Sequence, residues 1–274
     1  MMVSKHWQRR RRSMAALVLL IILSVAGLCE TLHLILPRAD GIHVWEENGA
    51  FLDASNAEDG YVMVKKESGK KLKVRILWED ITYTYDLAGD GEFEVYPLQK
   101  GSGSYKVLVY ENVKGNSYAQ VLSHDIEATM ENEHAAFLCP NRYVDYDGET
   151  QVIKYADEML SGVKSDREKA DTIGKWMKKS FGYDYILALT AKSGYIPDID
   201  ATFKSRMGMC FDFSSIMCAI MRSQGIPAQL VMGDADGTYH AWCKILLDGK
   251  WVLFDPTTEI TGKKVSNYTE EAYY

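Results

Sequence analysis

The stretch Gly208-Met209-Cys210-Phe211-Asp212 decides the fold, because it places a cysteine where a loop ends and a helix begins. Residues 211–224 are predicted to be helical, and Gly225 and Pro227 end the helix. Free N–H groups in the first turn of a helix stabilise a thiolate and can hold an oxyanion. Cys210 is therefore a candidate nucleophile, although a lone cysteine can equally be an inert core residue.

A histidine and a carboxylate follow on two predicted strands. Tyr239-His240-Ala241-Trp242 opens one strand, and Phe254-Asp255-Pro256-Thr257 ends its partner. A cysteine nucleophile needs a base within hydrogen-bond reach, and that base needs a third group to fix its tautomer. Each residue alone has an ordinary structural explanation. Together, in this order and on these elements, Cys210, His240 and Asp255 predict a catalytic triad.

Hairpin geometry supports the second half of this triad. If Asp248-Gly249 forms a two-residue turn, Leu247 pairs with Lys250. Side chains alternate faces along a strand, so His240 and Asp255 then lie on the same face as diagonal neighbours. We therefore expect the imidazole and the carboxylate to be in hydrogen-bond contact.

Residues 166–257 resemble the transglutaminase-like superfamily. The cysteine, histidine and aspartate runs quoted above look like the three catalytic motifs of that family. Arg222-Ser223-Gln224-Gly225-Ile226-Pro227-Ala228 is similar to its R-x-x-G-I-P-A segment, and Phe181-Gly182-Tyr183-Asp184-Tyr185 is similar to the segment before the catalytic helix. The resemblance covers about a third of the chain.

The resemblance implies a papain-like fold in which Cys210 is the nucleophile, His240 the general base and acid, and Asp255 the orienting carboxylate. Family members also use an upstream donor in the oxyanion hole. Tyr183 is a candidate for that donor, with simple core packing as its alternative. The sequence has no CxxC pair and no acidic loop with calcium-ligand spacing, so we expect neither a metal nor a cofactor.

The chain before this region is rich in predicted strands. Residues 42–129 contain five runs of β-branched and aromatic residues separated by turn clusters, at 61–64, 72–76, 81–85, 92–96 and 105–109. This spacing predicts a β-sandwich of immunoglobulin-like type. Helical spacing begins after about residue 130. We therefore predict an α+β protein with a sandwich domain at 40–130 and a transglutaminase-like domain at 135–274.

The N-terminus carries a predicted targeting segment. Four arginines at residues 9–12 precede an uncharged run at residues 14–29. Basic residues stay on the cytoplasmic side, so the remainder should be exported. The run is short for a spanning helix and long for a signal-peptide core. We expect residues 1–37 to be a retained membrane anchor that holds both domains on the extracytoplasmic side. The alternative is cleavage near Ser24-Val25-Ala26 and secretion.

Charge and cysteine usage exclude some classes of protein. The formal net charge is −7, and the first thirteen residues contribute five positive charges, so the rest carries −12. Such an acidic body repels phosphate backbones, so nucleic acid is not an expected partner. The five cysteines are odd in number and irregular in spacing, which does not indicate a disulfide framework. Cys218 and Cys243 lie in apolar elements and are predicted to be core.

These observations predict a cysteine-dependent acyl-transfer enzyme that acts on amide bonds of proteins or peptides outside the cytoplasm through a thioester. Resolution of the thioester by water makes the protein a protease or amidase, which we favour. Resolution by an amine makes it a crosslinking transglutaminase. A third possibility is a catalytically silent cell-surface binding or adhesion protein. The sequence predicts no oligomeric state.

Overall fold

The computed structural model describes residues 34–192 and 194–274. Leu34–Tyr274 forms one compact unit. The anchor predicted at residues 1–37 falls outside the described residues except for its last four, so it stays a prediction. Within the described ranges, no helix combines the length and the apolar character that crossing a membrane requires.

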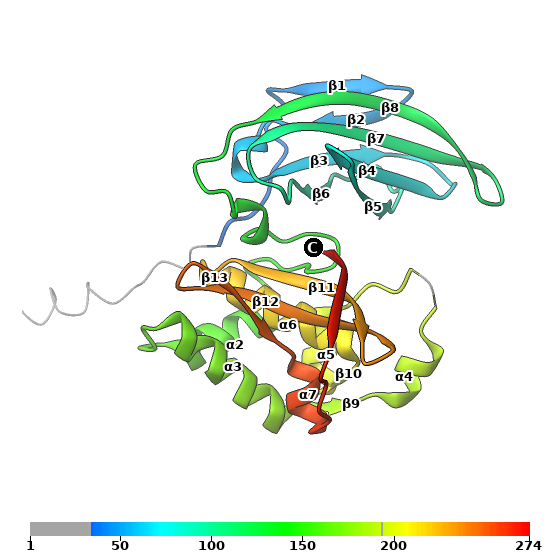
Figure 1. Cartoon of the computed structure of the whole chain (residues 1–274). Helices are drawn as coiled ribbons and strands as arrows, with labels where there is room; N and C mark the ends of the chain where they lie inside the picture. The colour runs from blue at the N-terminus through cyan, green and yellow to red at the C-terminus, as the bar shows by residue number, and fades with distance from the viewer. Residues whose placement is uncertain (1–33, 193) are drawn as a thin grey trace, which may run out of the picture. The chain divides into compact units, whose positions relative to one another are not determined.

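Two antiparallel four-stranded sheets make up the first half of the described chain (Figure 1). Their strand orders are β1-β2-β3-β6 and β5-β4-β7-β8. The strands are β1 Val44–Glu47, β2 Ala50–Asp53, β3 Tyr61–Lys66, β4 Leu72–Trp78, β5 Ile81–Leu87, β6 Glu94–Pro97, β7 Gly103–Lys114 and β8 Ser117–Ala128, with one 3-10 turn at Ala57–Asp59. The β-rich character predicted for residues 42–129 is confirmed, and its immunoglobulin-like type stays a prediction.

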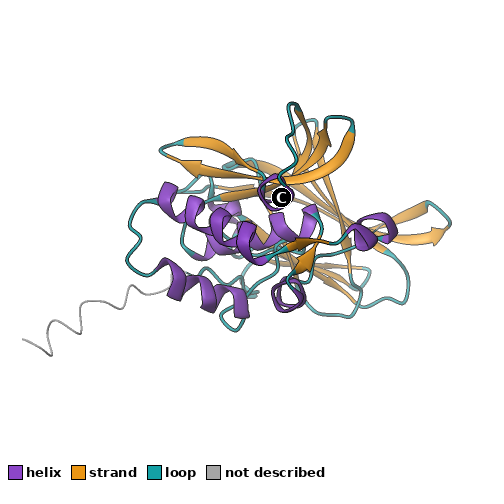
Figure 2. Cartoon of the chain, turned by 90° about the horizontal axis from the view of Figure 1, so that it is seen from below, coloured by secondary structure: helices purple, strands orange, loops and turns teal. Residues whose placement is uncertain are grey.

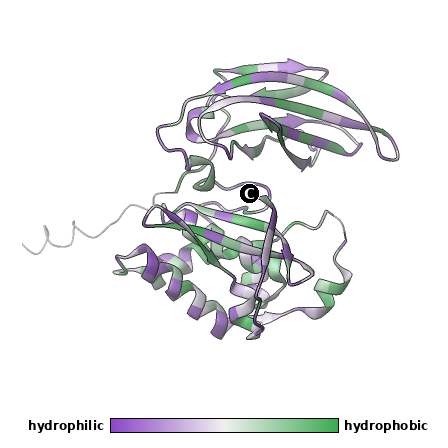
Figure 3. Cartoon of the chain, viewed as in Figure 1, coloured by the Kyte–Doolittle hydropathy of each residue, from purple (hydrophilic) through white to green (hydrophobic). Residues whose placement is uncertain are grey.

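The alternation of side chains explains why these residues form sheets with a shared core. Along β4, Leu72, Val74 and Ile76 are buried, whereas Lys73 and Arg75 between them are more accessible. Figure 3 shows the same alternation of apolar and polar residues along neighbouring strands. Buried side chains of both sheets belong to one apolar cluster. A strand with one buried face requires this period of two.

The second half combines a four-stranded antiparallel sheet with helices. The sheet has the order β13-β12-β11-β14, formed by β11 Ala228–Ala235, β12 Thr238–Leu247, β13 Lys250–Phe254 and β14 Tyr268–Tyr273. The helices are α2 Gln151–Leu160, α3 Asp166–Ser180, α4 Tyr185–Thr190, α5 Ile199–Ser205, α6 Cys210–Ser223 and α7 Pro256–Thr261, with a 3-10 turn at Ala135–Phe137. Two short strands, β9 Gly182–Tyr183 and β10 Met207–Gly208, pair in parallel.

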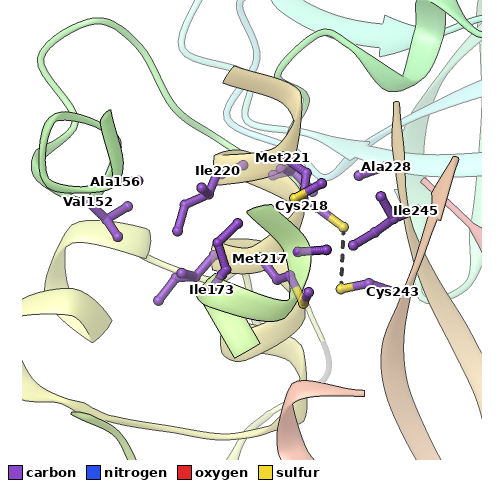
Figure 4. Packing of buried hydrophobic residues seen from close by; sticks show 14 of the residues in the cluster. Val152, Ala156, Ile173, Met217, Cys218, Ile220, Met221, Ala228, Cys243 and Ile245 are labelled. Atoms are coloured by element: carbon purple, nitrogen blue, oxygen red, sulfur yellow. Dashed lines mark hydrogen bonds between the residues drawn. The ribbon is translucent and has the colours of Figure 1, made fainter. Parts of the chain in front are cut away.

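Helix α6 is the centre of this second core. It packs against β11 and β12, and α2, α3, α5 and α7 contact it, so that helices lie in front of strands in the view from below (Figure 2). Every residue of α6 from Asp212 to Ser223 is buried. Figure 4 shows Met217 and Ile220 of α6 packed among side chains of α2, α3 and β12. Cys218 and Cys243 are fully buried in this core with their sulfur atoms 3.5 Å apart, so their predicted core role is confirmed.

The hairpin between β12 and β13 has the predicted register. Leu247 pairs with Lys250, and Asp248 and Gly249 both have positive φ, at 51° and 72°, as a two-residue turn of this kind requires. Strand β13 ends at Phe254, so Asp255 lies just outside it. Its successor Asp255 instead caps α7, a helix that the sequence analysis did not predict.

Strand β14 was also missing from the prediction, and it lies at the edge of the sheet beside β11. The two strands pair antiparallel, with a bulge between Met232 and Gly233. A side chain at Gly233 would collide with the backbone carbonyl oxygen of Thr269. A glycine at this position therefore lets β14 lie directly against β11.

Candidate active site

Cys210 is the first residue of α6, as predicted. The Asp212 carboxylate accepts a hydrogen bond from the backbone N–H of Met209 at 2.8 Å, which fixes the turn before the helix. The Tyr195 hydroxyl donates to the other carboxylate oxygen at 2.7 Å. Asp212 is buried, and this burial raises the pKa of its carboxyl group. Asp212 thus positions the loop that presents the thiol. The sequence signal for this role is its place three residues after Met209.

His240 and Asp255 are in contact, as the hairpin geometry predicted. Nε2 of His240 lies 2.8 Å from Oδ2 of Asp255. The other carboxylate oxygen, Oδ1, accepts hydrogen bonds from the backbone N–H groups of Thr257 at 2.9 Å and Thr258 at 3.2 Å. The cap of α7 therefore holds the carboxylate in one orientation, and the carboxylate in turn orients the imidazole.

The charge state of His240 follows from these contacts. Burial lowers the pKa of His240, but hydrogen bonds with Asp255 and Cys210 outweigh burial and raise it to about 9. Because Nε2 is committed to Asp255, Nδ1 is the ring nitrogen left for the thiol. Residues from three elements, the start of α6, β12 and the cap of α7, are thereby brought together.

Tyr268 is a member of this cluster that the sequence analysis missed. Its hydroxyl donates to Oδ2 of Asp255 at 2.9 Å, the same oxygen that His240 contacts. Burial and the nearby carboxylate raise the pKa of Tyr268, so the hydroxyl stays a donor. Tyr268 pairs with Ala235 across the β11–β14 ladder, and its ring lies against Trp242 with centroids 5.0 Å apart.

Tyr183 lies at the other side of the thiol. It pairs with Gly208 between the parallel strands β9 and β10, two residues before the nucleophile. Burial and the Cys210 thiol raise the pKa of Tyr183 to about 12, while a hydrogen bond from the backbone N–H of Cys210 opposes the rise. A hydroxyl and a helix-start N–H therefore meet beside Cys210.

An open cleft of about 1090 Å³ lies beside the thiol and the imidazole. Cys210 and His240 both line it, together with several aromatic side chains, Tyr143, Tyr183, Tyr195, Phe211 and Tyr239. A substrate can therefore reach the thiol from solvent. Within residues 34–192 and 194–274, no cluster of three or more His, Cys, Asp or Glu side chains could hold a metal ion.

Comparison with known proteins places this site in a family. Residues 153–256 match the model of the transglutaminase-like superfamily. This segment is a transglutaminase-like domain. The predicted resemblance and the mixed α/β fold of this domain are thereby confirmed. The uncharacterized protein YebA of Bacillus subtilis (strain 168) is 33% identical over 78 residues, which cover 22% of this chain and 11% of that relative's length.

Solved structures resemble the chain more distantly. A candidate cysteine protease from Cytophaga hutchinsonii is 17% identical with a TM-score of 0.44, and the alignment covers 78% of this chain and 83% of that one. The periplasmic domain of TgpA from Pseudomonas aeruginosa is 15% identical with a TM-score of 0.40, covering 82% and 78%. With TM-scores this low, the family assignment rests on the sequence match.

Proposed function

We propose that the transglutaminase-like domain is a cysteine-dependent acyl-transfer enzyme that hydrolyses amide bonds of peptides or proteins. The observation that carries the proposal is the contact between His240 and Asp255 at 2.8 Å, beside Cys210 in one solvent-open cleft. The pKa of His240 near 9 means that the imidazole holds a proton at neutral pH. An imidazolium on β12 beside the start of α6 favours attack by the sulfur of Cys210 as the nucleophile.

Acylation begins when the Cys210 thiolate attacks the amide carbonyl carbon and forms a C–S bond. The carbonyl π electrons move to the oxygen, and the Tyr183 hydroxyl, whose oxygen accepts from the Cys210 N–H, is the candidate donor to this oxyanion. As the tetrahedral intermediate collapses, the C–N bond breaks. His240 gives its Nδ1 proton to the leaving amine, and a thioester remains on Cys210.

Deacylation reverses these roles with water as the nucleophile. His240, now neutral, takes a proton from water as the oxygen attacks the thioester. The C–S bond breaks, a carboxylic acid leaves, and the thiolate–imidazolium pair returns. Asp255 holds the imidazole in the required tautomer throughout, and its own position is held by the α7 cap and Tyr268.

Two alternative functions differ from hydrolysis. One changes the second step, and the other lacks both steps. A lysine amine in place of water would give a crosslinking transglutaminase. The open cleft admits water freely, which supports hydrolysis. A silent binding protein has no need for an imidazole held by a buried carboxylate that is itself hydrogen-bonded four times.

The test is incubation of the full chain and its Cys210→Ala variant with a mixture of peptides, with and without a primary amine. If the protein is a hydrolase, mass spectrometry should detect peptides with new carboxyl termini after incubation with wild type. None should appear after incubation with Cys210→Ala. Incorporation of the amine in preference to water would favour the crosslinking reaction. Absence of any Cys210-dependent product would contradict an enzymatic function.

The export of these domains remains part of the proposal. It is supported by the arginines at residues 9–12 in front of the uncharged run at 14–29. Protease added to intact cells without their wall should digest the domains while a cytoplasmic control protein survives. Full protection of the domains would contradict export, and recovery of all the protein in the medium would contradict the retained anchor.

A further inference from the structure

Four large apolar side chains in the second half of the chain are unusually exposed. Among the described residues after 134, Tyr185 is 67% exposed, Ile186 75%, Leu189 87% and Tyr239 66%, whereas the other exposed large apolar residues there reach at most 43%. The first three belong to α4, which has no buried residue at all. Helix α4 therefore contributes nothing to the core, and its apolar residues need another explanation.

Three of these four side chains line the cleft that contains the thiol. Tyr185 and Leu189 line the cleft from α4, and Tyr239 lines it from β12, directly before His240. Ile186 is equally exposed on α4 but does not line the cleft. The cleft-lining residues of α4 and of β12 are uncharged apart from His240, so this part of the wall favours apolar contacts.

The position of α4 is fixed relative to the nucleophile. The backbone N–H of Asp184 donates to the Gly208 carbonyl oxygen at 2.7 Å, two residues before Cys210. The carboxylate of the same Asp184 accepts from the backbone N–H of Leu187 at 2.8 Å and caps α4. The rings of Tyr183 and Tyr185 also touch, with centroids 4.9 Å apart. One residue thus links the start of α4 to the loop that presents the thiol.

We propose that Tyr185, Leu189 and Tyr239 form a subsite for a large apolar or aromatic side chain of the peptide substrate, next to the amide that Cys210 attacks. The inference rests on the proposed amide-cleaving function and names its substrate class. Exposed apolar patches mark sites of interaction, and these residues line the same cleft as the thiol. A peptide side chain seated there places the scissile carbonyl over Cys210.

The experiment compares Leu189→Ser with Ile186→Ser, a matched change on the same helix. Both positions are exposed, so neither variant loses a core contact. The substrates are peptides that differ only in the residue beside the scissile amide, with Phe, Leu, Ala or Asp at that place. The readouts are kcat/KM for each peptide and the rate at which iodoacetamide alkylates Cys210.

We expect wild type to prefer the Phe and Leu peptides by at least tenfold over Ala, as pocket contacts of this kind provide roughly 10- to 200-fold. Leu189→Ser should remove most of that preference through a loss in kcat/KM for the large residues. The Ala peptide and the alkylation rate should not change. Ile186→Ser should behave as wild type in every assay.

Three results would overturn the subsite. The first is Cys210-dependent turnover with no preference among the four peptides, which leaves the proposed function intact. The second is an equal loss of kcat/KM in both variants, accompanied by a loss of self-association or of binding to lipid vesicles. That result would assign α4 to contact with a second copy of the chain or with a membrane surface. The third is no Cys210-dependent turnover of any peptide, which would remove the proposed function as well.

Discussion

Replacement of Asp255 by asparagine tests how the carboxylate acts on His240. The asparagine oxygen should remain with the backbone N–H groups of Thr257 and Thr258, because the α7 cap fixes those donors. The amide NH₂ then faces His240, where the carboxylate oxygen accepted a hydrogen bond. Nε2 must become an acceptor, so the proton moves to Nδ1. The nitrogen that faces the thiol can no longer take its proton.

The magnitude follows from the pKa of His240. Its rise from 6.5 to about 9 corresponds to about 3 kcal/mol of stabilisation of the imidazolium, or on the order of 10²-fold. This figure is a net one, because burial opposes the rise and Cys210 contributes to it, so it sets only the order of magnitude for Asp255. The wrong tautomer adds to the loss, and in a serine-protease triad an equivalent substitution lowers kcat by about 10⁴. We expect a loss in kcat of roughly 10² to 10⁴.

The assay is kcat and KM on a cleaved peptide, with thermal unfolding as the control for folding. KM should stay within about threefold of wild type, because Asp255 touches no substrate. Asparagine is as good a helix cap as aspartate, so α7 should remain folded. Turnover within threefold of wild type would refute the reasoning that Asp255 sets the tautomer of His240.

Three further predictions concern the groups around this contact. Tyr268→Phe removes one donor to the carboxylate and should lower kcat about tenfold, in line with hydrogen bonds to charged groups; unchanged kcat would show that the cap of α7 alone holds Asp255. The raised pKa of His240 stabilises the fold fully below about pH 6.5, and this stabilisation disappears as pH rises through about 9. Urea titrations should show that the free energy of unfolding declines over this range by at most about 3 kcal/mol, and by less in Asp255→Asn. Gly233→Ala places a methyl group against the Thr269 carbonyl oxygen and should destabilise the fold by about 1–3 kcal/mol. The control Gly174→Ala, in open space on α3, should not destabilise it. Equal stabilities of the two variants would show that β14 adjusts freely.

The proximity of His240 and Asp255 could be predicted because one local turn brings the end of β13 beside β12, whereas the α7 cap that orients Asp255 was not predicted. Asp248 and Gly249 accept positive φ, which fixes the pairing of Leu247 with Lys250 and the face of every residue beyond it. No tertiary information enters that argument. The start of α6 at Cys210 was predictable for a similar reason, since a glycine-containing loop precedes a long apolar run.

Tyr268 and α4 could not be predicted for two different physical reasons. Tyr268 reaches Asp255 through the pairing of β14 with β11, a contact between segments distant in sequence. The alternation in Tyr268–Tyr273 is weak because most of its residues are accessible. Helix α4 has six residues and no buried face, so it lacks the apolar period by which helices are predicted. Its apolar composition fits the proposed subsite, since the helix packs no residue into the core.

Thiol reactivity tests the central claim most directly. The full chain is treated with iodoacetamide at pH 7, and labelled peptides are mapped while turnover is followed. Of the four cysteines that the structure describes, Cys139, Cys218 and Cys243 are buried, and burial raises the pKa of Cys139 to about 12. The proposed ion pair predicts that Cys210 is labelled first and that activity is lost in step with this labelling. Equal labelling of a buried cysteine, or full activity after Cys210 is blocked, would contradict a Cys210–His240–Asp255 active site.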